Sequence, residues 1–156
     1  TSFESKASRS MRGRILFFMI GALAAVGAVW LFLHPPFRGF LQTVSFHERE
    51  YALDIAATDE ERALGLGGRE SLCDTCGMLF VFEEPGQPGF WMKGMRFSLD
   101  IAWLLDDTIV HIERHVPFDD QKTTYRPDTE ANQVLEFRAG TLDDVEVGEK
   151  VKFSFF

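Results

Sequence analysis

The chain has 156 residues, enough for one domain, and 46% of them are hydrophobic, including 16 phenylalanines, so a sizeable core can be buried. Residues 1–14 carry four basic side chains and one acidic side chain, a net +3, so the other 142 residues carry −11 of the total charge of −8. Such an acidic surface repels phosphate backbones and anionic headgroups, which excludes a nucleic-acid partner.

A run of nineteen uncharged residues, 15–33, follows the basic segment 1–14. A helix needs roughly 20 residues to cross a hydrocarbon layer of about 30 Å. The sequence therefore predicts one transmembrane helix at 15–33, in the cell membrane, with the basic segment in the cytoplasm and everything after Leu33 outside. A cleaved signal peptide remains the alternative, because Val26-Gly27-Ala28 offers small residues to a peptidase, but the apolar run exceeds the roughly 7–15 residues of such signals.

A short linker separates this run from the rest of the chain. Residues 34–40 contain Pro35 and Pro36, which cannot continue a helix and predict a stiff connection. Residues 41–156 are then expected to form a single extracytoplasmic domain.

Short segments with strand-like alternation or apolar runs recur through this domain. The expected strands are 43–47, 51–57, 78–82, 97–105, 109–116, 134–139 and 151–155. Thr58 followed three residues later by Glu61 is a capping box and predicts a short helix from Asp59, and a second helical turn is expected over 142–146. The sequence thus predicts a mainly β domain, either a compact antiparallel β-sandwich or a partly closed, jelly-roll-like barrel, with one or two short helices.

The strand 97–105 contains one carboxylate among apolar residues. Alternation places Phe97, Leu99, Ile101, Trp103 and Leu105 on one face. Asp100 lies on the other face, and a buried carboxylate requires a hydrogen-bonding or charged partner. We expect Lys93, Arg62 or Arg69 to hold it.

Five sequence blocks follow one another over about the last 115 residues. They are Ala57–Leu72, Gly77–Phe82, Phe90–Lys93, Leu99–Ile101 and Val134–Gly140. In this order they resemble the uncharacterised "domain of unknown function 192" family. Two departures from the family pattern occur: Gly67 stands where the family usually has Met, and Gly94-Met95 where it has Asn-Thr. The resemblance implies a small, mainly β domain of the sandwich or jelly-roll kind, and it brings no established activity.

The best candidate site takes polar residues from these blocks. The ligand-binding candidates are Arg62, Arg69, Trp91, Lys93, Asp100 and Glu136. Asp100 and Glu136 each interrupt an apolar strand, so they are either internal ion pairs that tie the helix to the sheet or carboxylates of raised pKa that act as acid or base in a cleft. We favour the structural interpretation, because no nucleophile lies beside a recognisable base.

Cysteines and methionines form a second candidate cluster. Cys73 and Cys76 are the only cysteines, and outside the cytoplasm their spacing predicts a disulfide, with a redox-active or metal-binding pair as the alternative. Met78, Met92 and Met95 lie nearby in the sequence, and their thioethers would suit Cu(I). We favour methionines that fill gaps in a phenylalanine-rich core.

His111, Glu113 and His115 alternate along one predicted strand face, a spacing that zinc enzymes also use. We favour a solvated sheet face, because no fourth ligand is in view.

Three functions follow from these patterns. The leading hypothesis is a membrane-anchored, extracytoplasmic module that binds an unidentified small molecule or protein, with no cofactor. The first rival is a hydrolase-type enzyme that uses Asp100 or Glu136, alone or with a metal at His111 and His115. The second rival is copper or redox handling through the cysteines with Met92 and Met95.

Overall fold

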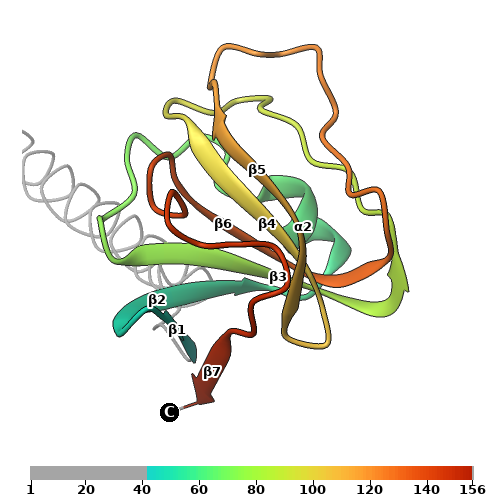
Figure 1. Ribbon diagram of the computed structural model, residues 1–156. Coiled ribbons are helices and arrows are strands. Elements are labelled where there is room, and N and C mark those ends of the chain that lie inside the picture. Colours follow the sequence, from blue (N-terminus) through green and yellow to red (C-terminus); the bar gives the residue numbers. More distant parts are fainter. Residues whose placement is uncertain (1–41, 156) are drawn as a thin grey trace, which may run out of the picture. The chain divides into compact units, whose positions relative to one another are not determined.

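Seven strands and one helix follow one another between residues 42 and 155, the part of the chain that the computed structural model describes (Figure 1). In chain order they are β1 (Gln42–Phe46), β2 (Arg49–Ala56), α2 (Asp59–Leu64), β3 (Cys76–Gly86), β4 (Leu99–Leu105), β5 (Thr108–Val116), β6 (Ala131–Arg138) and β7 (Lys152–Phe155). The mainly β prediction is therefore confirmed. The predicted helix after Thr58 is present, whereas residues 142–144 form a turn and residues 145 and 146 are irregular, so there is no second helical turn over 142–146.

All seven strands belong to one sheet, in the order β5-β4-β6-β3-β2-β1-β7. Neighbouring strands are antiparallel except β2 and β3, which are parallel and are connected through α2. A parallel pair requires such a crossover, because a tight turn can join only antiparallel strands. The fold is thus one mixed sheet, not a two-sheet sandwich.

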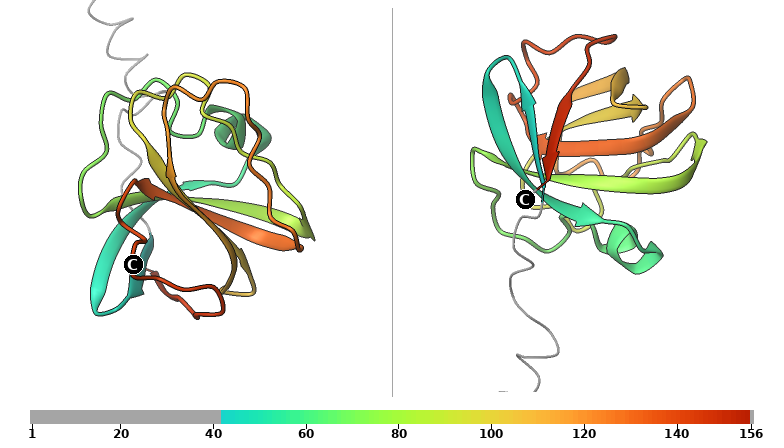
Figure 2. Two further views of the ribbon diagram at one scale, coloured as in Figure 1. Left: turned by 45° about the horizontal axis from the view of Figure 1, so that its top comes forward. Right: turned by 90° about the horizontal axis from the view of Figure 1, so that it is seen from below.

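The sheet curls until its two ends approach each other (Figure 2). The segment just before β7 runs along the start of β5, where Ile109 N donates to Glu149 O and Val151 N donates to Asp107 O, both at 2.9 Å. The result is a half-barrel, which agrees with the partly closed barrel among the two predicted architectures.

The curled sheet has a buried cluster on each face. We call the concave one the inner core, with Leu53, Leu79, Leu104, Leu135 and Phe137 among its members. The other, the outer core, includes Phe80, Ile101, Trp103 and Val134, and it is covered by the segments 65–75, 87–97 and 117–130. The last two segments run side by side (Figures 1 and 2), joined by the backbone bridge between Phe90 and Tyr125. β4, buried on both faces for most of its length, is the central wall between the two cores.

Gly77 in β3 leaves room for a close contact between strands. A Cβ atom at this position would lie 2.4 Å from Cε1 of Phe137 and 3.0 Å from the backbone oxygen of Glu136. We therefore expect Gly77→Ala to lower the free energy of unfolding by about 2 kcal/mol, the usual cost of overpacking, and the melting temperature by roughly 5 °C or more.

Gly86→Ala in the same strand is the matched control, because its added Cβ meets nothing within 4 Å. It should melt within a degree or two of the wild type. Equal melting temperatures for the two variants would mean that Phe137 moves aside without cost.

Candidate functional site

An open cleft of about 300 Å³ lies on the outer-core side of the sheet. Its walls come from α2 and the turn after it, from β3, and from the segment 88–95. The aromatic lining residues are Phe80, Phe82, Phe90 and Trp91, and the charged ones are Arg62, Lys93 and Glu136. These elements are far apart in the sequence, and the sheet order brings them together.

The capping box fixes the helix that forms one wall. Thr58 Oγ1 accepts a hydrogen bond from Glu61 N at 3.2 Å, and the Glu61 carboxylate accepts one from Thr58 N at 3.1 Å. The helix ends at Gly65, whose φ of 50° places it where glycine is favoured over residues with a Cβ. A six-residue helix needs such caps, because its few internal hydrogen bonds leave most end groups unsatisfied.

Arg62 links this helix to the sheet. Its Nη1 donates to the backbone oxygens of Ala57 at 2.5 Å and Val81 at 2.7 Å, and its Nη2 contacts Asp59 Oδ1 at 2.5 Å. The guanidinium also lies over the ring of Phe82, 5.2 Å from its centroid. Arg62 therefore ties the capped helix to the sheet through backbone carbonyls, and its ion pair is with Asp59 of the helix itself, not with the strand carboxylate that the sequence predicted.

Glu136 lines the cleft and is only 5% exposed. In the strand register it lies between Met78 of β3 and Ile101 of β4, so its neighbours across the sheet are apolar. Within residues 42–155 its carboxylate has no hydrogen bond or ion pair. Burial raises the pKa of Glu136 to about 8, against the opposing attraction of Arg69, whose guanidinium is paired with Asp54 at 2.7 Å.

The mouth of the cleft is apolar and carries one cation. Leu64 and Trp91 are 70% and 57% exposed, which is unusual for large apolar side chains. Lys93 is also exposed and lines the cleft. An aromatic cleft with a buried carboxyl and an apolar mouth has the composition of a small-molecule site.

Asp100 is fully buried, but the partners we expected for it are wrong. Oδ1 accepts a hydrogen bond from His115 N at 2.8 Å, and Oδ2 accepts one from Leu142 N at 2.9 Å. The reason is its face: Asp100 pairs with Phe137 and therefore points to the inner-core side, whereas Glu136, one residue earlier on β6, points to the outer side. Of the six ligand-binding candidates, Arg62, Trp91, Lys93 and Glu136 thus line the cleft, Arg69 acts on it electrostatically, and Asp100 lies elsewhere.

A family model, DUF192, described as "Uncharacterized ACR", matches residues 42–153. The chain belongs to the DUF192 family. The match runs from the start of β1 into β7 and includes every residue of the cleft.

Two solved structures are similar to this DUF192 chain. A protein of unknown function from Novosphingobium aromaticivorans is 29% identical, with a TM-score of 0.64, and the match covers 71% of this chain and 82% of that one. A protein described as a "putative transcription regulator" from Sinorhizobium meliloti is 24% identical, with a TM-score of 0.63, and the match covers 73% and 91%. The second likeness shows the fold alone. No curated protein matches the chain.

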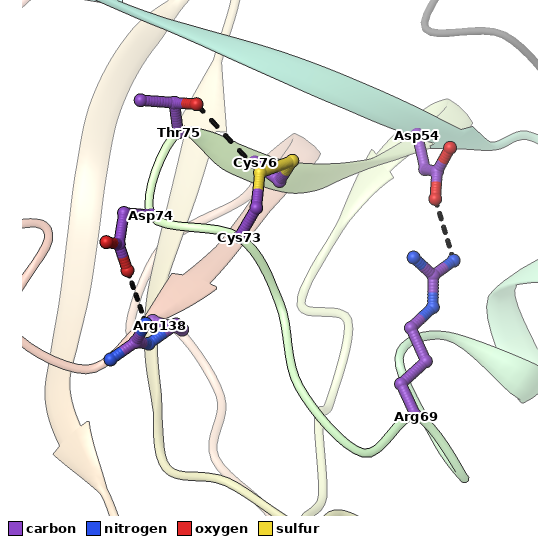
Figure 3. The surroundings of a disulfide bond; sticks show 7 residues. All are labelled: Asp54, Arg69, Cys73, Asp74, Thr75, Cys76 and Arg138. Carbon is purple, nitrogen blue, oxygen red and sulfur yellow. Dashed lines mark hydrogen bonds and ion pairs between the residues drawn. A yellow bond between two sulfur atoms is a disulfide. The ribbon is translucent and has the colours of Figure 1, made fainter.

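The two cysteines of this DUF192 chain are joined in a disulfide, as predicted (Figure 3). The bond closes the loop that leads into β3, and an ion pair between Asp74 and Arg138 lies beside it. Because both sulfur atoms are used in the disulfide, neither is a thiolate ligand for a metal. Figure 3 also shows the pair of Asp54 and Arg69 on the other side of this loop.

The methionines have different surroundings. Met78 and Met92 are buried in the outer core, so the interpretation that they fill gaps between phenylalanines is confirmed. Met95 is partly buried, packs against the same core and lines the cleft.

The histidine strand does not gather three ligands. His111 Nε2 lies 3.2 Å from Glu113 Oε1, while His115 Nε2 lies 2.9 Å from Asp143 Oδ1. A register shift between β4 and β5 and a φ of 52° at His115 interrupt the alternation on which the shared face depended. Within the part of the chain that the structure describes, no group of three or more His, Cys, Asp or Glu side chains could hold a metal ion.

Leu64 and the phenylalanines of the cleft were not among the site residues predicted from the sequence. Phe80, Phe82 and Phe90 look like ordinary core residues in a phenylalanine-rich chain. The one available signal was Leu64, an apolar residue at the end of a helix whose other residues are mostly charged.

No helix between residues 42 and 155 is long and apolar enough to cross a membrane. The predicted span at 15–33, the basic segment 1–14 and the linker 34–40 lie outside the described residues.

Proposed function

We propose that this domain binds a small organic molecule in the cleft between α2, β3 and the segment 88–95. The observation that carries the proposal is Glu136, a buried carboxyl that lines the cleft without a hydrogen bond or ion pair to any of the described residues. Buried carboxyls are normally satisfied by the protein, since an unpaired one reduces stability. A ligand that completes its hydrogen bonds explains why it is there.

The rest of the cleft supports this proposal. Its volume of about 300 Å³ suits a molecule with one or two rings, at the lower end of small-molecule sites. Aromatic side chains provide apolar contact area, and the exposed Leu64 and Trp91 at the mouth would be covered by a bound molecule.

Acid–base catalysis by Glu136 is a second candidate function. Burial of Glu136 in the cleft favours it, because burial raises the pKa of this carboxyl to about 8 and a catalytic acid or base works best with a pKa near the ambient pH. Asp100 does not join it as a second carboxylate, since the two residues point to opposite faces of the sheet. The other charged residues that line the cleft are Arg62 and Lys93, so a second carboxylate would have to come from the substrate.

We further propose that residues 15–33 anchor the domain in the membrane with residues 41–156 outside the cytoplasm, as the basic segment before the apolar run supports. The strongly acidic domain of this chain disfavours contact with nucleic acid.

Binding can be tested with three phenyl-bearing probes of similar shape and different charge: 2-phenylethylamine, 2-phenylethanol and 3-phenylpropionate. Saturation-transfer NMR on the purified full chain should show binding of at least one. Leu64→Ser and Trp91→Ala should weaken that binding at least threefold, because each removes apolar area at the mouth of the cleft.

Val147→Ser is the matched control, since Val147 is also a large exposed apolar residue but does not line the cleft. It should bind the probe like the wild type. The proposed function would be refuted if neither Leu64→Ser nor Trp91→Ala changed the affinity for the probe, or if no probe bound at all.

A further inference from the structure

We propose that the ligand of this cleft is an organic cation, a protonated amine on an aromatic or short aliphatic body, bound with its ammonium group against Glu136. This inference rests on the proposed function of the cleft as a ligand site. It adds the chemical class of the ligand.

The Glu136 carboxylate has unused capacity to accept hydrogen bonds. An ionised carboxylate can accept about four, and Glu136 receives none from residues 42–155. An alkylammonium group carries three donors and a positive charge, and charge-assisted bonds of this kind are about twice as strong as neutral ones. A protonated amine therefore supplies the donors that the described protein groups do not.

Among residues 42–155, the cations in and beside the cleft do not form ion pairs with the Glu136 carboxylate. Arg62 is held by two backbone carbonyls and Asp59, and Arg69 is paired with Asp54. Lys93 is exposed. Apolar Met78 and Ile101 lie beside Glu136 on the neighbouring strands. These surroundings leave the carboxylate without a close counter-ion, so its charged form gains most from a cation that enters with the ligand.

The aromatic walls of the cleft also suit a cation. Cations are attracted to the faces of aromatic rings, and the cleft presents Phe80, Phe90 and Trp91. Arg62 over Phe82 already shows this contact at the edge of the same cleft. The excess of acidic residues in the domain also raises the local concentration of cations and lowers that of anions.

Isothermal titration calorimetry of the full chain with the three probes named above tests the inference. At pH 8 the amine should bind at least tenfold more tightly than the alcohol, and the carboxylate should bind most weakly. The affinity for the amine should rise roughly 50-fold from pH 6 to pH 8, because a carboxyl with a pKa of about 8 is about 1% ionised at the lower pH and half ionised at the higher one. Alkylamines stay protonated over this range, so the change reports on Glu136.

Substitutions locate the effect. Glu136→Gln should lower the affinity for the amine at least tenfold at pH 8 and remove its pH dependence, and a thermal melt checks that the variant is folded. Lys93→Gln should strengthen binding of the amine severalfold, since it removes a like charge from the cleft. Glu84→Gln, an exposed carboxylate outside the cleft, should leave binding unchanged.

Two failures are distinguishable. Binding of the alcohol or the carboxylate as tightly as the amine, or amine binding that survives Glu136→Gln, would overturn this inference and leave the cleft as a ligand site. Absence of binding by all three probes would overturn the proposed function and this inference together.

Discussion

Glu136→Gln is expected to stabilise the protein at pH 8 by on the order of 4 kcal/mol. Burial raises the pKa of Glu136 from 4.5 to about 8. Between these two pH values the unfolded chain has lost the proton and the folded chain retains it, so the stability of the wild type falls as pH rises through this window. Above pH 8 the folded state carries the full cost of a buried charge, which at 1.36 kcal/mol per pKa unit gives the magnitude above. Glutamine has no charge to bury.

Urea unfolding of the full chain at several pH values measures this effect. The variant and the wild type should have similar stability near pH 4.5 and diverge steadily up to pH 8, where the difference corresponds to roughly 13 °C in melting temperature. Glu84→Gln, which changes an exposed carboxylate, should follow the wild type at every pH. A variant that is no more stable than the wild type at pH 8 would show that the protein satisfies the Glu136 carboxylate internally.

A stabilised Glu136→Gln variant would also bear on function. Residues that lower stability persist when activity or binding requires them, which is the usual trade-off at functional sites. A more stable Glu136→Gln that no longer binds the amine would separate the two roles in a single variant. If the carboxylate of Glu136 had a purely structural role, neutralising it would instead lower the stability of the protein.

Much of the fold follows from local patterns in the sequence. The capping box of Thr58 and Glu61 predicts α2, because the residues that satisfy the first turn lie within that turn. The alternation over 97–105 predicts β4 and places Asp100 opposite the stripe of Ile101 and Trp103. These features depend on neighbours in the chain, so the sequence is sufficient.

The cleft depends on strand order and register, which the sequence alone does not specify. Asp100 and Glu136 look alike in the sequence, since each interrupts an apolar strand. In the structure the pairing of Asp100 with Phe137 sends the two carboxylates to opposite faces. In β5, one register shift changes which side chains share a face, and this separates His115 from His111 and Glu113.

Asp100→Asn is expected to have the opposite effect on stability from Glu136→Gln. Each oxygen of the Asp100 carboxylate accepts a backbone hydrogen bond, one from His115 at the end of β5 and one from Leu142 in the turn after β6. An asparagine can place its oxygen toward only one of these donors, and its NH₂ group then faces the other N–H. The variant loses one charge-assisted bond, weakens the second and leaves a buried donor unsatisfied, so we expect a loss of about 3 kcal/mol and of roughly 10 °C in melting temperature.

Asp119→Asn is the control for this substitution, because Asp119 is exposed on the loop after β5. It should melt like the wild type, and probe binding should be retained by Asp100→Asn below its melting temperature, since Asp100 does not line the cleft. Unchanged stability of Asp100→Asn would mean that the turn at Leu142 is held by other contacts, chiefly the hydrogen bonds that Arg114 donates to Leu142 O and Val145 O. Opposite signs for the two neutralised carboxylates would instead show that the half-barrel depends on Asp100 for its stability and carries Glu136 at a cost in stability, as the proposed ligand site requires.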